Sequence, residues 1–400
     1  MTPLAVILGN SRVRLWGIDG ATRLERQLGA AGIVLVRRVV AGEALPWGDP
    51  LLMLRGDHLF DDRVVRDLAA SRGVLLLSGG AAVAACVDAD VAERARLVLD
   101  GEATSAGLPG VAVTTPEALT PGWSKRLLKA APAFVEPIRA ADAPALERFL
   151  FDGSYKGVTD LVTKWVWPGP ARAATRACAG AGIGPNTVTS ASWLLAAAAA
   201  LLFSRGAFAW GLVAAWAMTF LDTVDGKLAR VTVTSTKLGH LFDHVLDLVH
   251  PPLWYFAWAW GFAGESATGG ATGVVLACIV AGYVAGRLVE GAFDAWLAGF
   301  PMFSWKPLDS WLRLVLARRN PNLLLLSGFL AAGRPADGLV AVAAWTVAST
   351  VLLVVRLAQA AAARSRGGEL SSWLAAFDDA RGPLPAHARP FVSIRGALAE

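Results

Sequence analysis

The sequence predicts a multi-domain chain: a soluble N-terminal α/β domain followed by an all-α polytopic membrane domain of six transmembrane helices. Hydrophobic residues make up 55% of the 400 residues and charged residues only 17%, and the mean hydropathy is +0.49. Such a composition is too apolar for one soluble globular protein. The densely apolar part begins near residue 185, whereas residues 1–128 alternate short apolar runs with helix-like segments.

Residues 1–128 are expected to form a mostly parallel sheet with helices on both faces. The runs LAVILG, IVLVRRVV, PLLMLRGDHLF and GVLLLSG have the length and the β-branched content of strands. They alternate with the helix-like segments ATRLERQLGAAG, DDRVVRDLAAS and ADVAERARLVLDG. This alternation favours a parallel sheet, in which ligand sites lie beyond the carboxyl ends of the strands.

Residues 129–184 are predicted to be a linker followed by a juxtamembrane amphipathic helix. The stretch up to about residue 157 is rich in alanine, proline and charge, and we expect it to contain a short helix. Further on, tryptophans and basic residues mix as in a helix that lies on the cytoplasmic membrane surface. These residues are Lys164, Trp165, Trp167, Arg172 and Arg176.

Residues 185–360 carry six apolar segments. Most of them approach the roughly 20 residues that a helix needs to cross a bilayer, and the fifth is short. The predicted spans are about 187–204, 208–226, 238–262, 271–294, 320–333 and 337–358. The polar residues 361–400 are predicted to be a cytoplasmic C-terminal tail that lies loosely on the surface.

The distribution of charge predicts the orientation. Lysines and arginines are concentrated in the loops on one side of the six spans, and the positive-inside rule makes that side cytoplasmic. An even number of spans places both termini there, so we expect a multi-pass protein of the inner or plasma membrane. The chain does not begin with a charged segment and a long apolar core, so no cleavable signal peptide is expected. No basic run is interleaved with aromatic residues, which argues against a nucleic-acid partner.

The stretch from Asp222 to Asp247 is predicted to be the active site. On a helix, Asp222 and Asp225 share one face, and Gly239, Asp243 and Asp247 recur every fourth residue along one side of a second helix. One aspartate at the centre of a membrane helix costs roughly 2.5–3.5 kcal/mol. Four aspartates therefore require positive charge among them.

Two divalent metal ions, Mg²⁺ or Mn²⁺, are the cofactors that these carboxylates predict. Hard cations prefer carboxylate oxygen, and two such ions together can clamp a pyrophosphate. Arg230 and Lys237 are near enough in sequence to take residual phosphate charge. Two alternatives stay open: a transition metal held by His240 and His244 with Asp243, and a transporter whose aspartates bind a permeating cation.

The pattern D-x2-D-G-x2-A-R-x8-G-x3-D-x3-D, which runs from Asp222 to Asp247, resembles the signature of the CDP-alcohol phosphatidyltransferase family at every fixed position. The resemblance implies a six-helix membrane enzyme, usually a homodimer, that moves a substituted phosphate from a CDP-linked donor to an alcohol and releases CMP. It implies that Asp222, Asp225 and Asp243 bind metal and that Asp247 is the catalytic base beside the metals. The nucleotide-binding positions that it implies are Gly226, Ala229, Arg230 and Gly239.

The segment GPNTVT resembles the family's P-N-x-x-T entry into the first span, which implies that Asn186 and Thr189 approach the nucleotide. The whole resemblance covers roughly residues 150–360. The acceptor it implies is an alcohol or a polyol phosphate, and the pattern leaves its identity open.

Several charged residues outside the signature are candidates for the acceptor site. Three interpretations stay open for the arginines named below. They bind a phosphate of the acceptor, they bind a lipid headgroup, or they are ordinary positive charges of cytoplasmic loops. Glu290 and Asp294, with Arg287, are expected either to line the acceptor cavity or to form a local charge arrangement on their helix. The candidates for binding phosphate are Lys237, Arg313, Arg318 and Arg319.

The N-terminal domain resembles, in degenerate form, the sugar-nucleotide nucleotidyltransferases. The loop LGNSRVRLWG keeps Gly9 and Arg12 or Arg14 of a Gly-rich phosphate loop but lacks its second glycine and its lysine. Asp57 resembles the family's metal-binding aspartate, with an ordinary loop or cap role as the alternative. The fusion as a whole resembles bifunctional enzymes that make CDP-inositol and then transfer inositol phosphate, which implies a second possible activity, synthesis of the CDP-linked donor.

Overall fold

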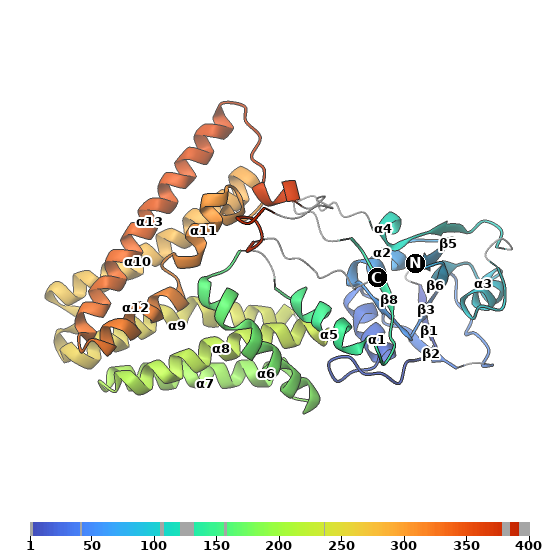
Figure 1. Ribbon diagram of the computed structural model, residues 1–400, viewed down its shortest axis with the longest axis horizontal. Coiled ribbons are helices and arrows are strands. Elements are labelled where there is room, and N and C mark those ends of the chain that lie inside the picture. Colours follow the sequence, from blue (N-terminus) through green and yellow to red (C-terminus); the bar gives the residue numbers. More distant parts are fainter. Residues whose placement is uncertain are drawn as a thin grey trace.

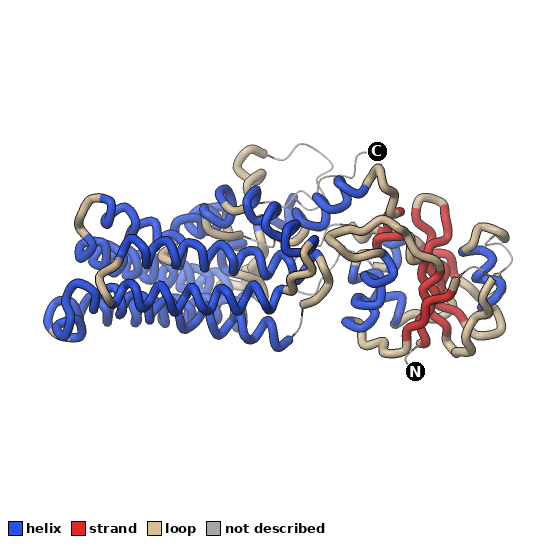
Figure 2. Tube along the Cα trace, turned by 90° about the horizontal axis from the view of Figure 1, so that it is seen from below, coloured by secondary structure: helices blue, strands red, loops and turns tan. Residues whose placement is uncertain are grey.

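The computed structural model has an α/β domain at one end and a helical region at the other (Figures 1 and 2). It describes residues 3–40, 42–104, 108–120, 132–155, 158–235, 237–377 and 385–391. Within these ranges, the structure describes only the backbone of residues 237–244, 246, 247 and 376.

The N-terminal domain is built on a six-stranded sheet. Its strands are β1 (Leu4–Leu8), β2 (Val36–Val39), β3 (Leu51–Arg55), β5 (Val74–Ser78), β6 (Ala81–Val87) and β7 (Ala112–Thr114). Their order is β2-β1-β3-β6-β5-β7. β1 pairs in parallel with β2 and β3, and β5 pairs in parallel with β7. Among the described strands of this sheet, β6 alone runs antiparallel to its neighbours. The prediction of a mostly parallel sheet is confirmed.

Strand β6 is not predicted from the sequence, because the composition of this segment is unusual for a strand. The segment AAVAACV is rich in alanine, which is depleted in strands. It becomes a strand because Gly79 and Gly80, with φ values of 55° and 81°, form a two-residue turn that folds it back onto β5. Positive φ at both central residues is the requirement of the tight hairpin turn, and glycine meets it without strain.

Helices cover both faces of the sheet, as the sequence predicts. Successive residues of β1 point to opposite sides. Ala5 and Ile7 pack with α1 (Gly20–Ala30) and α2 (Asp62–Ala69), while Val6 and Leu8 pack with α3 (Ala92–Leu99). The short helix α4 (Pro116–Leu119) contacts α2 and β5.

The stretch predicted as a linker contains regular structure. Strand β8 (Val135–Pro137) pairs antiparallel with β4 (His58–Phe60) and so returns to the N-terminal domain. This pairing satisfies the backbone of β4, which the main sheet does not reach. The expected short helix is α5 (Ala143–Asp152), and a π-helical turn η2 (Val162–Val166) and helix α6 (Pro168–Gly180) follow.

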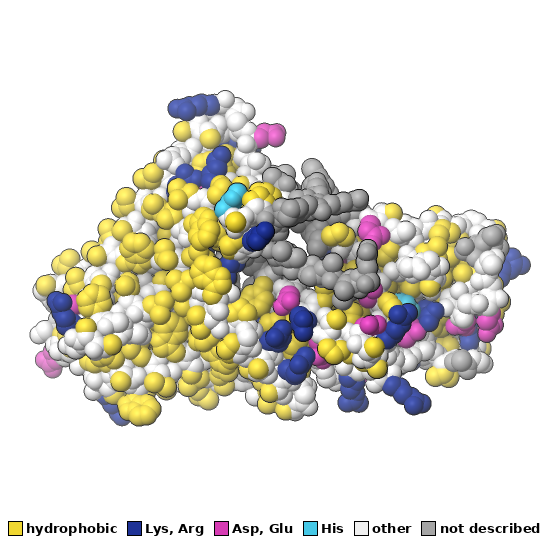
Figure 3. Space-filling view, in the orientation of Figure 1, with side chains coloured by type: hydrophobic (Ala, Val, Ile, Leu, Met, Phe, Trp, Pro, Cys, Tyr) yellow, Lys and Arg dark blue, Asp and Glu magenta, His cyan; other side chains and the backbone are white. Residues whose placement is uncertain are grey.

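A helix lies at each of the six predicted spans, and two of these helices end two residues before the predicted span ends at 294 and 333. The six helices are α7 (Pro185–Ser204), α8 (Phe208–Val231), α9 (Lys237–Ala263), α10 (Gly270–Ala292), α12 (Arg319–Ala331) and α13 (Pro335–Ser365). By length and composition, three described helices are apolar enough to cross a membrane: α7, α10 with its continuation η4 (Phe293–Ala298), and α13. Hydrophobic side chains dominate the helical region on the face shown in Figure 3. Short 3-10 turns, η3 (Gly264–Thr268) and η5 (Met302–Ser304), follow α9 and precede α11 (Pro307–Val315).

The described part of the C-terminal tail is packed rather than loose. α13 continues past the predicted end of the last span at 358 to Ser365. Beyond it, the turn η6 (Trp373–Phe377) lies on α11, where Trp373 Nε1 donates a hydrogen bond of 3.0 Å to Ser310 Oγ. The ring of Phe391 contacts that of Trp311 edge-on at 5.1 Å. These aromatic contacts are long-range in sequence, so no local pattern predicts them.

The N-terminal domain docks onto the helical region through Trp16. This side chain is only 1% exposed and packs with Val224, Leu228 and Val231 of α8. Its backbone N–H and its Nε1 both donate to Glu147 of α5, at 2.9 and 3.0 Å. A tryptophan from the soluble domain is therefore part of the core around α8.

Two arginines of α1 cap the C-terminal end of α8. Arg23 donates to the carbonyl oxygen of Val231, and Arg26 donates to that of Thr232 at 2.7 Å. The last carbonyls of a helix lack intrahelical partners and carry partial negative charge, which cations stabilise. The N-terminal domain thus fixes the end of α8, the helix that carries the first half of the signature.

Candidate functional site

Asp222 and Asp225 lie in the C-terminal half of α8, one turn apart on one face. Asp225 is buried, and Asp222 is partly buried. Carboxylate oxygens are the ligands that hard divalent cations prefer, so these two residues fit the predicted metal site. Among the side chains that the structure describes, no group of three His, Cys, Asp or Glu residues is placed to hold a metal ion.

The second half of the signature lies on α9, outside the described side chains. The structure places the backbone of these residues on one helix, as predicted. The roles predicted for these residues, in binding metal, nucleotide or phosphate and as the catalytic base, therefore stay predictions. The residues are Lys237, Gly239, His240, Asp243, His244 and Asp247.

Thr189 of α7 lies beside Asp225. Its Oγ1 donates a hydrogen bond of 2.6 Å to Oδ2 of Asp225, and both side chains are buried. Asn186, one turn earlier on α7, is exposed at the end of that helix. The structure therefore brings one of the two P-N-x-x-T residues to the aspartates and leaves the other at the helix entrance.

Arg319, the first residue of α12, pairs with Asp222. Its Nη2 lies 2.5 Å from Oδ2 of Asp222. The neighbouring Arg318 forms an ion pair with Glu290 of α10. Glu290 thus has a partner on another helix, which differs from the local arrangement considered from the sequence. The two ion pairs connect α8, α10 and α12 around the aspartates.

Four arginines line a cavity of about 110 Å³ beside these ion pairs, which we call the arginine cavity. Three of them, Arg313, Arg318 and Arg319, are the predicted phosphate candidates, and the fourth is Arg287. Nη1 of Arg313 is buried and has no hydrogen-bond acceptor among the described residues. A buried guanidinium N–H without an acceptor is costly, so an anionic ligand would suit this cavity.

Asp160, which sequence reasoning missed, lines the same cavity. Its carboxylate accepts hydrogen bonds from the backbone N–H groups of Val162 and Thr163 at 3.0 and 3.1 Å, and from Asn320 Nδ2 at 3.0 Å. It therefore starts the turn η2 and ties it to α12. An aspartate placed two or three residues before the first N–H groups of a helical turn is a sequence signal for the start of that turn, and Asp160 stands in this position.

The signature end of α8 is held by the segment before η2. Lys227 Nζ and Arg230 Nη1 donate to the carbonyl oxygen of Ser154, at 3.1 and 2.8 Å. Lys227 also lies 3.2 Å from the ring centroid of Tyr155, and burial raises the pKa of Tyr155 to about 12. A Cβ at Gly226 would meet only the end of Arg230, at 3.9 Å, so protein packing alone does not require glycine there.

The N-terminal domain has a cavity of about 240 Å³ at the carboxyl ends of β1 and β3, where the sequence places a possible ligand site. Gly9 and Asp57 line it, whereas the exposed Arg12 and Arg14 do not. Arg55 pairs with both carboxylate oxygens of Asp57, at 3.0 and 2.7 Å. Burial alone would raise the pKa of Asp57, but hydrogen bonds from His58 and Arg55 hold it well below its usual range.

The chain is similar to a known protein family and to curated proteins. Residues 183–375 match the CDP-alcohol phosphatidyltransferase family. The chain is 34% identical over 88 residues to the phosphatidylinositol phosphate synthase of Mycobacteroides abscessus, which covers 20% of this chain and 40% of that protein. It is 34% identical over 84 residues to the phosphatidylinositol phosphate synthase of Streptomyces avermitilis, covering 21% of this chain and 34% of that protein. The chain thus spans less than half the length of each of these curated relatives. Together with the signature on α8 and α9, the match identifies residues 183–375 as a CDP-alcohol phosphatidyltransferase domain.

Proposed function

We propose that this protein is a membrane-bound CDP-alcohol phosphotransferase of phospholipid synthesis. It moves a substituted phosphate from a CDP-linked donor to an alcohol acceptor and releases CMP. The observation that carries the proposal is the setting of the first two signature carboxylates, with Thr189 hydrogen-bonded to Asp225 and Arg319 paired with Asp222. The family match over residues 183–375 supports the same reaction.

Four carboxylates would hold the two divalent ions, Mg²⁺ or Mn²⁺. They are Asp222, Asp225, Asp243 and Asp247. When bound, the ions supply the positive charge that offsets the diphosphate of the donor. The nucleotide would lie against Asn186, Thr189, Gly226, Ala229, Arg230 and Gly239.

The proposed reaction is an in-line displacement at phosphorus. The oxygen of the acceptor hydroxyl forms a bond to the phosphorus that carries the substituent. The bond from that phosphorus to the bridging oxygen breaks, and the bridging oxygen leaves as part of CMP. The carboxylate of Asp247 takes the hydroxyl proton, which makes the attacking oxygen a better nucleophile.

The acceptor that we propose is a polyol phosphate. The arginine cavity beside Asp222 contains the buried Nη1 of Arg313, and arginine matches phosphate oxygens with two parallel donors. Both curated relatives are named phosphatidylinositol phosphate synthase, which makes inositol phosphate the first candidate. A phosphatidyl group linked to CMP is CDP-diacylglycerol, so this lipid is the matching donor.

The membrane arrangement that we propose has six spans, α7 to α10, α12 and α13, with both termini and the aspartates at the cytoplasmic side of an inner or plasma membrane, in a homodimer. The three apolar helices and the loop charges support it. Synthesis of the CDP-linked donor by the N-terminal domain is not part of the proposal, because the loop LGNSRVRLWG lacks the second glycine and the lysine of a phosphate-binding loop.

The test is CMP release by the purified full chain in detergent. CDP-diacylglycerol and Mg²⁺ or Mn²⁺ are supplied with inositol phosphate, inositol or glycerol phosphate as the acceptor, and the lipid product is identified by mass spectrometry. We expect CMP release that requires the metal and a phosphorylated acceptor, and its loss in Asp247→Asn. An unchanged rate in Asp247→Asn would exclude Asp247 as the base, and no CMP release with any acceptor would refute the proposed reaction.

A further inference from the structure

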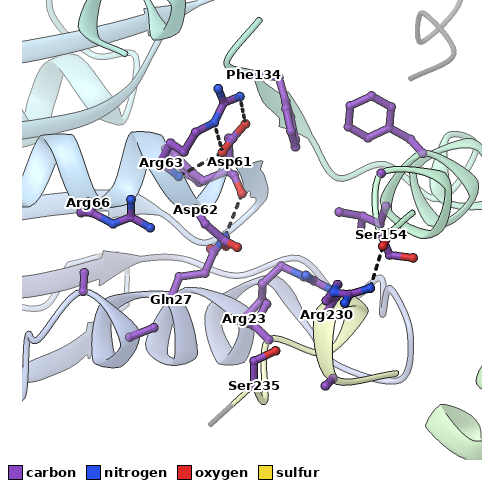
Figure 4. A pocket seen from close by; sticks show the side chains of 18 residues that line it. Arg23, Gln27, Asp61, Asp62, Arg63, Arg66, Phe134, Ser154, Arg230 and Ser235 are labelled. Carbon is purple, nitrogen blue, oxygen red and sulfur yellow. Dashed lines mark hydrogen bonds and ion pairs between the residues drawn. The ribbon is translucent and has the colours of Figure 1, made fainter. Parts of the chain in front are cut away.

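A large interdomain cavity, of about 540 Å³, lies between the N-terminal domain and the signature end of α8 (Figure 4). Arg23 and Gln27 of α1, Arg66 of α2 and Arg230 of α8 line this cavity (Figure 4). Ala229 of α8 lines it as well. The volume lies within the roughly 300–1,000 Å³ that is typical of small-molecule sites. Neither the signature nor the N-terminal fold alone predicts this cavity, because both domains build it.

The lining of the interdomain cavity carries an excess of positive charge. Four arginines face two aspartates there, and one of these arginines, Arg63, is paired with Asp61 at 2.6 Å. Arg66 is exposed and has no ion-pair partner among the described residues. An excess of guanidinium groups around one cavity favours an anionic ligand.

Arg23 strengthens this argument because its charge is buried. The side chain is 3% exposed, and its hydrogen bond goes to a neutral carbonyl oxygen, that of Val231. Burial lowers the pKa of Arg23 to about 10; the charge of Asp62 partly opposes that shift, and the charge of Arg26 adds to it. A buried cation is stabilised by an anion beside it, and the interdomain cavity is where one can approach.

Aromatic rings form another part of the wall. Phe60, Phe134 and Phe149 line the interdomain cavity, and the rings of Phe134 and Phe149 meet edge-on at 4.8 Å. Nucleobases stack on aromatic side chains, whereas an inorganic anion gains nothing from them. Arginines together with phenylalanines therefore favour a nucleoside phosphate over a simple anion.

We propose that the interdomain cavity binds the nucleotide end of the CDP-linked donor, so that the N-terminal domain supplies part of the donor site through Arg23 and Arg66. This inference rests on the proposed function. Asp225 and Ala229 lie four residues apart on one face of α8, a rise of about 6 Å. A donor whose CMP phosphate lies among the arginines of the interdomain cavity directs its second phosphate along this face of α8 toward Asp225.

The test measures binding of CMP to the full chain in detergent by isothermal titration calorimetry, together with kcat and KM for CDP-diacylglycerol. Arg66→Ala is the main variant, since this residue lines the interdomain cavity and is exposed. We expect its Kd for CMP to rise at least about tenfold, because charge-assisted hydrogen bonds to phosphate are lost. We expect Arg66→Lys to recover part of the affinity, and KM to change more than kcat.

Arg26→Ala is the matched control. Arg26 lies on the same helix as Arg23 and also caps the end of α8, but it does not line the interdomain cavity. We expect its Kd for CMP to stay within about twofold of the unmodified protein, whereas Arg23→Gln weakens binding. If Arg26→Ala loses as much affinity as Arg23→Gln and Arg66→Ala keeps it, Arg23 acts through domain contact and the inference is overturned.

The inference and the proposed function fail differently. If the unmodified protein binds CMP and releases it from CDP-diacylglycerol while Arg66→Ala and Arg23→Gln bind it equally well, the inference alone is wrong. If the unmodified protein neither binds CMP nor releases it, the proposed function is wrong as well. Parallel titrations with UMP and with inorganic phosphate show whether the base contributes, and equal affinity for phosphate would overturn the assignment to a nucleotide.

Discussion

Arg23 in the N-terminal domain donates a hydrogen bond to the carbonyl oxygen of Val231, the last residue of the helix that carries Asp222 and Asp225. The contact joins the two domains at the end of α8, which carries the first half of the signature, rather than at a remote loop. Because the last carbonyls of a helix have no intrahelical partner, displacement of the N-terminal domain would leave this end of α8 uncapped. The N-terminal domain is therefore placed to affect the geometry of the signature even without chemistry of its own.

We expect Trp16→Ala to separate the domains and to destabilise the protein. Trp16 is buried among three residues of α8, and removal of a buried tryptophan costs about 3–5 kcal/mol of the free energy of unfolding. Thermal unfolding in detergent and limited proteolysis between the domains measure the effect. Trp47→Ala is the control, because Trp47 in the same domain is 87% exposed. Equal thermal midpoints for the two variants would contradict the docking role.

We expect Gly17→Ala to be more destabilising than Gly32→Ala. Both glycines have positive φ, +78° and +87°, so both substitutions carry a similar backbone strain of about 1–2 kcal/mol. A Cβ at Gly17 would also lie 2.5 Å from the carbonyl oxygen of Ala179 in α6, whereas one at Gly32 would meet nothing within 4 Å. The difference between the thermal midpoints of the two variants measures the free energy lost when the N-terminal domain moves away from α6. Equal thermal midpoints would mean that Gly17 does not lie close to Ala179 in solution.

We expect Thr189→Val to slow CMP release without unfolding the protein. The substitution keeps the shape of the side chain but removes the donor to Oδ2 of Asp225, and a hydrogen bond to a charged group contributes about 1.5–3 kcal/mol. A decrease in kcat of about tenfold or more is the expected result, measured under metal saturation. Thr187→Val, at an exposed position of the same helix, is the control. An unchanged kcat would show that Thr189 does not position Asp225.

Local periodicity predicted the parts of this structure that depend on neighbours in sequence. The alternation in residues 1–128 gave a sheet with helices on both faces, and the spacing of Asp222 and Asp225 placed both carboxylates on one helical face. The six helices likewise follow from long apolar runs. These features arise from contacts within a few residues, which one sequence contains in full.

Contacts between distant segments were not predictable in the same way. Asn320 donates a hydrogen bond to Asp160, which lies 160 positions earlier in the chain. Trp16 packs into a core formed with residues of α8, which lie more than two hundred positions after it. Strand β6 depends on a glycine turn and on two flanking strands rather than on its own alanine-rich composition. In each case tertiary packing decides the outcome over local preference. The interdomain cavity likewise depends on contacts between segments that are distant in the sequence.

Arg319 leads to a prediction about metal requirement. Its guanidinium lies 2.5 Å from Oδ2 of Asp222, an oxygen that a divalent ion would also use. A cation at this distance competes with the metal for the carboxylate, because both favour the same charged oxygen. We therefore expect Arg319→Gln to lower the Mg²⁺ concentration that gives half-maximal CMP release. Since Arg319 also lines the arginine cavity, we expect the KM for inositol phosphate to rise in the same variant.

Arg313→Gln separates these two effects. Arg313 lines the same cavity but does not pair with Asp222, so its substitution should raise the KM for inositol phosphate and leave the Mg²⁺ requirement unchanged. Titrations of Mg²⁺ and of the acceptor on both variants provide the comparison. A higher Mg²⁺ requirement in Arg319→Gln would mean that Arg319 orients Asp222 for the metal instead of competing with it. An unchanged acceptor KM in both variants would exclude the arginine cavity as the acceptor phosphate site.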